Sequence, residues 1–419
     1  MTSVDTQQLQ RLNLEAWAYL LRQDAEMAAV QVTAVAAEPL NQQTTRYWIT
    51  LAGHPEPITL LGQESTPAEY HVYNDYAPHL DQLLPRCWYS ELLGNVGWMV
   101  LDDTAEDHPA NTWTMRDVEK LVEQLAIMHS TFWGQEPTSE QLPAYIGRTG
   151  RTADTTPAPG SLADKVRAIY RRQTRSRSGR ALPASYLSFD LRQVGTQAPA
   201  LKRATVGLQI LRGMGGWPGV LTTKHLDAFD ALLEQPDLML KPLREVPFTL
   251  LHGRPAVENW RISLFDEYNL LGWQHATLGP SVCDLVYVLE DFFVNCTSVN
   301  ERDKRPYYFY QEWPIVEETL IDTYFLKLAQ QLPAEEYNAR ALRRHALPAA
   351  RCLYTLTTWL PLISDWFAEL PNGRHTWEIL ENMGEEELAH TAHSPLIALR
   401  PHLRPLFARF LEAYTLLWM

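Results

Sequence analysis

The chain has 419 residues, 46% of them hydrophobic, which is enough for a substantial core in one large domain or two ordinary ones. Fourteen Trp and eighteen Tyr argue against a disordered chain, and the net charge of -14 argues against general binding to nucleic acid or to an anionic membrane surface. The sequence contains no run of eighteen apolar residues, so it predicts no membrane span. The first residues lack the basic and apolar regions of a signal peptide.

The four cysteines have neither the spacing of a metal site nor the pattern of a disulfide framework. They are Cys87, Cys283, Cys296 and Cys352, and their wide scatter is typical of buried thiols. We therefore expect a soluble, cytoplasmic protein that binds neither nucleic acid nor membrane.

The first hundred residues predict a helix followed by a small sheet. Apolar residues at helical spacing indicate a helix over residues 5–23. Runs rich in β-forming residues predict five strands, Gln31–Val35, Thr45–Leu51, Pro57–Leu61, Leu84–Tyr89 and Trp98–Asp103.

From Thr114 onward the pattern is mainly helical. Thr114 and Asp117 predict the N-terminus of an amphipathic helix that ends near Phe132, with His129 on its apolar face and so in a structural role. A further helix is expected over Asp227–Leu240, and apolar periodicity continues in three later segments, Val316–Leu328, Leu347–Leu362 and Pro401–Leu417.

Two segments of different composition lie between these helices. Residues 135–161 are rich in Pro, Thr and Gly and predict a linker or long loop. Arg171–Arg180 is a dense basic run, which fits either a solvated helix end or a docking patch for an anionic partner.

The stretch Thr249–Asp284 has the pattern strand, loop, strand, loop, strand. It resembles the catalytic segment of the aminoglycoside phosphotransferase and choline kinase-like family, which carries His-Gly-Asp-x-x-x-x-Asn, a hairpin, Ile-Asp-Trp and then Gly-Asp-Pro-x-x-Asp-Leu. The residues that match at the family spacing are His252, Gly253, Asn259, Trp273, Gly279, Asp284 and Leu285. The segment Leu125–Gly134, LAIMHSTFWG, is similar to a second family motif, Leu-Ala-x-x-His-x-x-x-Trp.

Two positions in this segment depart from the family. Arg254 replaces the catalytic Asp, and Gly272 replaces the metal-binding Asp. A guanidinium stays protonated and cannot act as a base. Glycine has no ligand atom, and Asn259 alone is a poor site for Mg²⁺, which usually also takes carboxylate oxygen.

The region that would hold the nucleotide phosphates departs as well. The loop Glu38–Thr44, at the place of the family's glycine-rich loop, contains no Gly, although close approach of backbone to phosphate usually needs Gly. Leu60 or Leu61 stands where the family has its phosphate-binding Lys, and the first lysine of the chain is Lys120. Glu69 matches the Glu that would pair with that Lys.

The resemblance implies an α+β fold of the bilobal protein kinase-like type. We expect a small N-terminal lobe with an antiparallel sheet and a leading helix (residues 1–103) and a larger, mainly helical C-terminal lobe (residues 104–419) that contains the degenerate catalytic segment 249–285.

The resemblance also assigns candidate site residues. Arg254 and Asn259 stand at catalytic positions, and Asp284 stands at that of a structural brace for the catalytic loop. Asp102 and Asp103, at the hinge, and Glu69 are candidates for cofactor binding, and no residue is assigned to a metal.

The losses favour a catalytically impaired member, a pseudokinase that binds a small ligand or a partner protein. Two alternatives stay open. One is an atypical small-molecule kinase, or another enzyme of the same cleft, in which Asp266, Glu258 or Asp102 supplies the acid or Arg254 grips an anion. The other is a structural subunit. ATP and Mg²⁺ are implied only by the enzyme alternative, and the sequence identifies neither the partner nor the oligomeric state.

Overall fold

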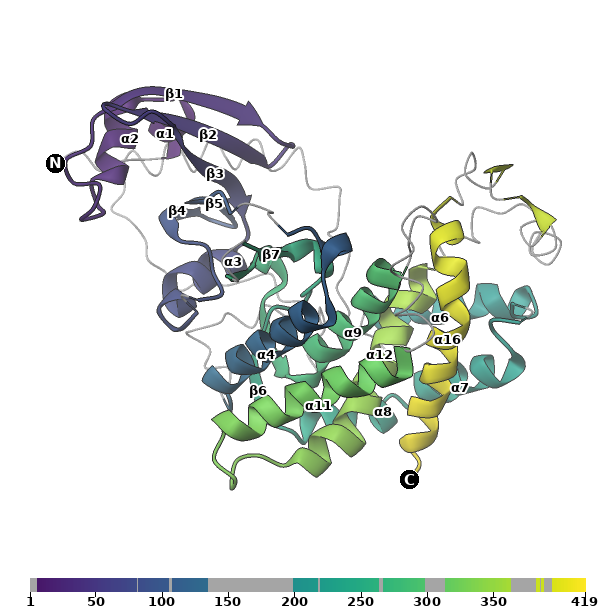
Figure 1. Cartoon of the computed structure of the whole chain (residues 1–419). Helices are drawn as coiled ribbons and strands as arrows, with labels where there is room; N and C mark the ends of the chain where they lie inside the picture. The colour runs from purple at the N-terminus through teal and green to yellow at the C-terminus, as the bar shows by residue number, and fades with distance from the viewer. Residues whose placement is uncertain are drawn as a thin grey trace. The chain divides into compact units, whose positions relative to one another are not determined.

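Figure 1 shows the chain as a computed structural model, which describes residues 6–80, 82–104, 108–134, 199–217, 219–263, 267–297, 313–362, 382–384, 386–387 and 394–419. The described residues form two compact units. The first contains those up to Pro109 together with Asn259–Ala276, and the second contains those from Ala110 to Glu258 and from Thr277 onward. The hairpin of the segment 249–285 therefore belongs to the first unit. The basic run 171–180 and the expected linker 135–161 lie outside the described residues.

A five-stranded antiparallel sheet is the framework of the first unit. Its order is β1-β2-β3-β5-β4. The strands are β1 (Val32–Pro39), β2 (Thr44–Leu51), β3 (Ile58–Ser65), β4 (Cys87–Leu93) and β5 (Val96–Asp102). In the centre of the sheet Leu60 pairs with Tyr47 on one side and with Asp102 on the other. All five expected strands are present, and β1 and β3 are longer than their sequence patterns predict.

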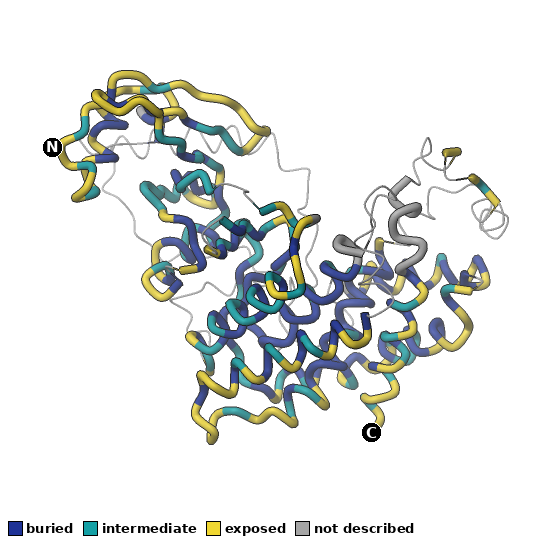
Figure 2. The backbone as a smooth tube through the Cα atoms, in the orientation of Figure 1, coloured by how far each residue is buried: buried dark blue, intermediate teal, exposed yellow. Residues whose placement is uncertain are grey.

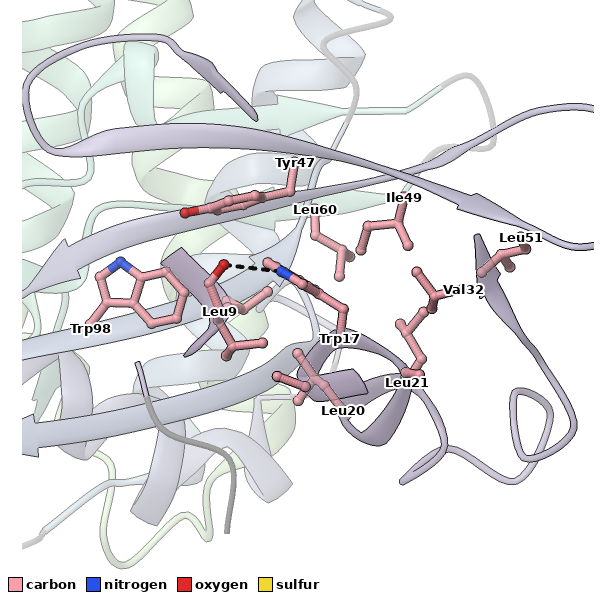
Figure 3. Packing of buried hydrophobic residues seen from close by; sticks show 13 residues of the cluster. Leu9, Trp17, Leu20, Leu21, Val32, Tyr47, Ile49, Leu51, Leu60 and Trp98 are labelled. Carbon is pink, nitrogen blue, oxygen red and sulfur yellow. Dashed lines mark hydrogen bonds between the residues drawn. The ribbon is translucent and has the colours of Figure 1, made fainter. Parts of the chain in front are cut away.

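Two short helices, α1 (Thr6–Gln10) and α2 (Leu14–Leu21), cover one face of this sheet. Figure 3 shows the core that they form with it. The indole of Trp17 is fully buried, packs on the ring of Tyr47 with centroids 4.8 Å apart, and donates to the carbonyl of Leu9 over 3.0 Å. Because Trp17 contacts both the sheet and α1, it fixes the position of the N-terminal helices.

The single helix expected over residues 5–23 is broken in the structure. Leu12 has a φ of 58°, a left-handed conformation that ends a helix. Asn13 then caps α2, because its side-chain oxygen accepts from the backbone N–H groups of Glu15 and Ala16 over 3.0 and 3.2 Å. The break turns α2 so that Trp17 and its neighbours face the sheet.

The remaining elements of the first unit lie near the C-terminal end of β3, at Ser65. They are α3 (Pro67–His71), η1 (Val72–Tyr76), η2 (Ala77–His79), β7 (Trp260–Ile262), β8 (Tyr268–Leu270) and η5 (Trp273–His275). The hairpin β7–β8 is tied to this unit by backbone hydrogen bonds from Leu270 to Leu83 over 2.8 Å and from His108 to Ile262 over 3.2 Å.

The second unit is mainly helical, with one small antiparallel pair of strands. Its helices include α4 (Met115–Thr131), α6 (Pro199–Gly213), α7 (Thr223–Glu234), α8 (Asp237–Arg244), α9 (Val282–Thr297), α11 (Trp313–Gln331), α12 (Leu347–Tyr354) and α16 (Ser394–Leu416). The short helical turns of this unit are η3 (Ala110–Thr112), η4 (Val257–Asn259), η6 (Ala341–Ala346) and η7 (Thr355–Trp359). The last residue of η4, Asn259, already belongs to the first unit. The two strands are β6 (Phe248–Leu251) and β9 (Thr277–Pro280). The helix expected over Asp227–Leu240 is divided at Pro236 into α7 and α8.

Two features order the helices of this unit. The carboxylate of Asp117 accepts from the backbone N–H and the hydroxyl of Thr114 over 2.6 and 2.7 Å, which starts α4 where the sequence predicts it. Helix α9 packs against both α11 and α12, all three bury apolar side chains, and Figure 2 shows buried residues along their length.

Four charged residues form a buried ion cluster that joins four helices of the second unit. Arg351 of α12 pairs with Glu317 of α11 and lies 3.4 Å from Glu290 of α9. Arg409 of α16 lies 3.2 Å from Glu290 and 3.6 Å from Glu317. Two positive and two negative groups cancel, so each buried charge is compensated, and removal of any one would leave another buried and unpaired.

The predicted fold class is confirmed: the chain is α+β, with a small antiparallel-sheet unit and a larger, mainly helical one, as in the bilobal protein kinase-like fold. Among the described residues, no helix combines the length and the apolar character needed to cross a membrane.

We predict that Trp17→Ala lowers the free energy of unfolding by about 3–5 kcal/mol, because it empties a core position and removes the contact with Tyr47. Chemical denaturation followed by circular dichroism measures this change. Tyr19→Ala, on the same helix at a side chain that is 42% exposed, is the control and should change the stability little. Equal effects of the two variants would contradict the packing described for Trp17.

Candidate functional site

The loop after β6 is held by one buried carboxylate. Asp284, in the first turn of α9, is fully buried and accepts from the backbone N–H groups of His252 and Gly253 over 2.7 and 3.0 Å. Gly253 has a φ of 79°, a conformation that a residue with a side chain adopts only with strain. Asp284 thus contacts the loop at the point where the backbone turns most sharply.

His129 of α4 contacts the same carboxylate. Its Nε2 is 3.4 Å from Asp284, and its Nδ1 is 2.6 Å from the hydroxyl of Tyr324 on α11. The carbonyl of His129 accepts from the hydroxyl of Thr249 on β6 over 2.7 Å. Because His129 is completely buried and these contacts join three elements, its place in the structure is that of a core residue, as its sequence pattern suggests.

His252 is also buried within the loop. Its Nδ1 accepts from the backbone N–H of Arg254 over 3.3 Å, so the proton of a neutral imidazole is on Nε2. His252 therefore supports the turn that presents Arg254.

Arg254, which the sequence resemblance aligns with the catalytic Asp, is paired within its own part of the chain. Its Nη2 lies 2.5 Å from a carboxylate oxygen of Glu258, and its guanidinium also hydrogen-bonds the hydroxyl of Tyr287 on α9. Burial lowers the pKa of Arg254, but Tyr287, Glu258 and Asp291 outweigh this effect and raise it above its ordinary value. For Tyr287, burial acts in the upward direction and raises its pKa to about 12. Arg254 is thus a permanent cation with an anionic neighbour, and it cannot accept a proton from a substrate.

Asn259 lies in the first unit, beside the glycine that replaces the metal-binding Asp. Its backbone carbonyl accepts from the N–H of Leu271 over 2.8 Å. A Cβ atom added to Gly272 would lie 3.0 Å from the side-chain oxygen of Asn259 and 3.3 Å from that of Gln274. Gly272 also has a φ of 79°. The backbone at this position therefore suits glycine, and the space that a larger side chain would need is bordered by two amide groups.

Glu69 contacts the next residue of the same turn. It is only 3% exposed on α3, accepts from the side-chain amide of Gln63 on β3 over 3.2 Å, and accepts from the backbone N–H of Trp273. Burial raises the pKa of Glu69 to about 7, although these hydrogen bonds act in the opposite direction. Asn259 and Glu69 thus flank the Gly272–Trp273 turn.

Gln63 is a residue that the sequence analysis missed. Leu60 or Leu61 was expected at the position of the phosphate-binding Lys, but Leu60 is buried in the core against α2. Because β3 continues to Ser65, Gln63 is the strand residue that contacts Glu69. The sequence signal that could have identified Gln63 is the alternation of inward and outward residues in a strand, continued beyond Leu61.

Asp102 and Asp103 contact other parts of the first unit. The indole N–H of Trp88 donates to Asp102 over 2.5 Å, and Arg46 of β2 lies 2.5 Å from Asp103. Burial raises the pKa of Asp102. Both carboxylates therefore make structural contacts. Among the described residues, neither is hydrogen-bonded to Glu69 or Asn259.

The residues present do not fit a magnesium–nucleotide site of the family type. Gly272 has no side-chain oxygen, and the group that contacts Glu69 from β3 is the neutral amide of Gln63. Within the described ranges, no three His, Cys, Asp or Glu side chains gather in a way that could hold a metal ion. Asp266, one of the acids considered for an atypical mechanism, lies outside those ranges.

The chain was compared with protein-family models, curated proteins and solved structures. No protein-family model matches the chain, and a search of curated proteins finds no match. Solved structures do match. An amicoumacin kinase is 12% identical, with 88% of this chain and 90% of that chain covered and a TM-score of 0.44. An aminoglycoside phosphotransferase from Alicyclobacillus acidocaldarius is 13% identical, with 92% of each chain covered and a TM-score of 0.43.

A choline kinase from Cryptosporidium parvum is 9% identical, with 95% of this chain and 99% of that chain covered and a TM-score of 0.41. These proteins are of the kind that the sequence resemblance names. At such identities and TM-scores the likeness says nothing about activity.

We predict that Asp284→Ala lowers the free energy of unfolding by at least about 1–3 kcal/mol, because it leaves the buried N–H groups of His252 and Gly253 without an acceptor. Urea denaturation measures the change. Asp227→Ala, in the same unit at a side chain that is 70% exposed, is the control and should stay within about 0.5 kcal/mol of the unmodified protein. An unchanged stability of Asp284→Ala would rule out the bracing role.

Proposed function

We propose that this protein is a phosphotransferase-fold protein that is impaired in phosphoryl transfer and that binds a small ligand or a partner protein. The observation that carries the proposal is the pairing of Arg254 with Glu258 and Tyr287 at the position where the family has its catalytic Asp. Phosphoryl transfer requires a group at that position to orient the attacking hydroxyl. A guanidinium cannot take the role of that carboxylate.

The surroundings of Gly272 support the same proposal. A kinase of this family holds Mg²⁺ with a carboxylate and an Asn side chain, and the ion in turn holds the nucleotide phosphates. Here the glycine has no side chain, and Asn259 has an amide neighbour in Gln274. Gln63 in place of Lys removes a further charge that would stabilise phosphate. Such parts act as a unit in catalysis, so the loss of several together weighs more than any single loss.

The second candidate function is an atypical enzyme with a relocated acid. One observation favours it: Glu258 is 65% exposed and lies on the same loop as Arg254, so a carboxylate is present near the position of the missing one. Asp102, the other described candidate, is bound to Trp88.

We propose a cytoplasmic location for the protein. Cys87, Cys283 and Cys352 support it, because all three are free thiols and thiols persist in reducing compartments. Burial raises their pKa values, that of Cys87 to about 12, so none of the three is a reactive thiolate.

We predict that Mg²⁺ does not increase the affinity of the protein for ATP, because Gly272 provides no metal ligand. Isothermal titration calorimetry with ATP, with and without Mg²⁺, measures the two affinities. Thermal shift with the same nucleotides is the independent readout. Micromolar binding of Mg²⁺-ATP that disappears on removal of the metal would overturn the proposal and favour the atypical enzyme.

We predict that Arg254→Asp remains inactive in an ATP-dependent transfer assay with a panel of hydroxyl compounds, since the metal ligand and the phosphate-binding Lys are still absent. Arg254→Ala is the matched variant, and both should give the background rate of the unmodified protein. ATP-dependent transfer by the unmodified protein, lost in Arg254→Ala, would instead make Arg254 a catalytic residue.

A further inference from the structure

Glu69 is a buried carboxyl group whose three hydrogen-bond donors are all neutral. They are the side-chain amide of Gln63 and the backbone N–H groups of Trp273 and Thr66. An ionised carboxylate in the protein interior is normally compensated by a cation. In the family that this chain resembles, a Lys would supply that cation, and here Gln63 occupies the place next to Glu69.

The elements packed around α3 supply no lysine or arginine. These elements are β3, β4, β5, η1 and η5, and all their residues are described. Their titratable groups, with those of α3 itself, are Glu64, Tyr70, His71, Tyr73, Asp75, Tyr76, Cys87, Tyr89, Glu91, Asp102 and His275. Of the two histidines, His71 contacts Asp75 over 2.8 Å. Tyr73 and Cys87 are close enough for the charge of Glu69 to act on them, and burial keeps both neutral at pH 7.

We propose that Glu69 is a positioning residue that holds the Gly272–Trp273 turn through the N–H of Trp273, and that protonation of its carboxyl weakens this hold. An ionised carboxylate accepts a charge-assisted hydrogen bond, which is about twice as strong as a bond to a neutral acceptor. A protonated carboxyl also brings a donor to a place where the neighbouring groups, Gln63 Nε2 and the N–H groups of Trp273 and Thr66, are donors themselves. Protonation therefore replaces favourable contacts by weaker or competing ones.

The turn matters because Asn259 borders it on the other side. Gly272 lies between the two, with its virtual Cβ position 3.0 Å from the Asn259 oxygen, so displacement of Trp273 moves the backbone on which this part of the candidate site depends. The inference concerns the geometry of the turn and holds whether or not the protein transfers phosphate. Its failure is thus distinguishable from failure of the proposed function.

Burial, which raises the pKa of Glu69 to about 7 from 4.5, sets the pH range of the effect. The folded state holds this proton more tightly than the unfolded state, so the contribution of Glu69 to stability falls as the pH rises from 4.5 to about 7 and is constant above that range. The hold on Trp273 changes in the opposite direction, because the ionised form is the better acceptor. As Glu69 ionises, the turn at Trp273 is held more firmly and the stability of the folded state decreases.

The experiment follows the backbone amide of Trp273 by NMR in the full chain labelled with ¹⁵N-tryptophan, with the resonance assigned through Trp273→Phe. We expect its amide proton shift to titrate with a midpoint near pH 7. Glu69→Gln, which keeps the shape and removes the charge, should abolish this titration. Glu64→Gln, on the exposed side of β3, is the matched control and should leave the midpoint unchanged.

A second variant tests the role of Gln63 independently. Gln63→Lys restores a cation beside Glu69 and should move the midpoint down by about 1–3 pH units. It also keeps the test decisive if Glu69→Gln fails to fold. A Trp273 amide that does not titrate between pH 5 and pH 9, or a midpoint that Gln63→Lys leaves unchanged, would overturn the inference.

Discussion

The hydrogen bonds from His252 and Gly253 to the carboxylate of Asp284 are the interaction on which the candidate site depends. They join the sharp turn after β6 to the first turn of α9, and His129 and Tyr324 continue the contact to α4 and α11. This arrangement is made by groups that precede residue 254 in the loop or lie outside the loop. The side chain at position 254 takes no part in these hydrogen bonds.

Much of the fold was predictable because it depends on local pattern. The strands have runs of β-forming residues, and α4 has a capping pair and a continuous apolar face, so neighbouring residues suffice to identify them. Breaks within helices were not predicted. Leu12 fits the apolar spacing of a continuous helix, yet it has a φ of 58°, and Trp17 packs on Tyr47 of the sheet, a contact between residues far apart in the sequence. Pro236 was a local signal for the break between α7 and α8, but the spacing of apolar residues on either side of it indicated one continuous helix.

The substitutions at the candidate site were predictable from the sequence, and their partners only in part. Arg254 and Gly272 are visible in an alignment of motifs by spacing alone. Tyr287 beside Arg254 could not be inferred, because helix α9 had to be placed in space first. Gln63 was missed for another reason: the apolar run ends at Leu61, but pairing with β5 extends β3 by four further residues to Ser65. Strand ends are set by the partner strand, and no single segment contains that information.

The ion cluster of the second unit has a consequence for the order in which the chain folds during synthesis. Glu290, Glu317 and Arg351 leave the ribosome before Arg409, and without Arg409 their charges sum to -1 in a buried place. Until α16 emerges, the nascent helical unit contains one excess negative charge that its interior cannot solvate, which disfavours closure of α9, α11 and α12 around it. We therefore expect these three helices to close fully only after α16 has left the ribosome and supplies the missing charge.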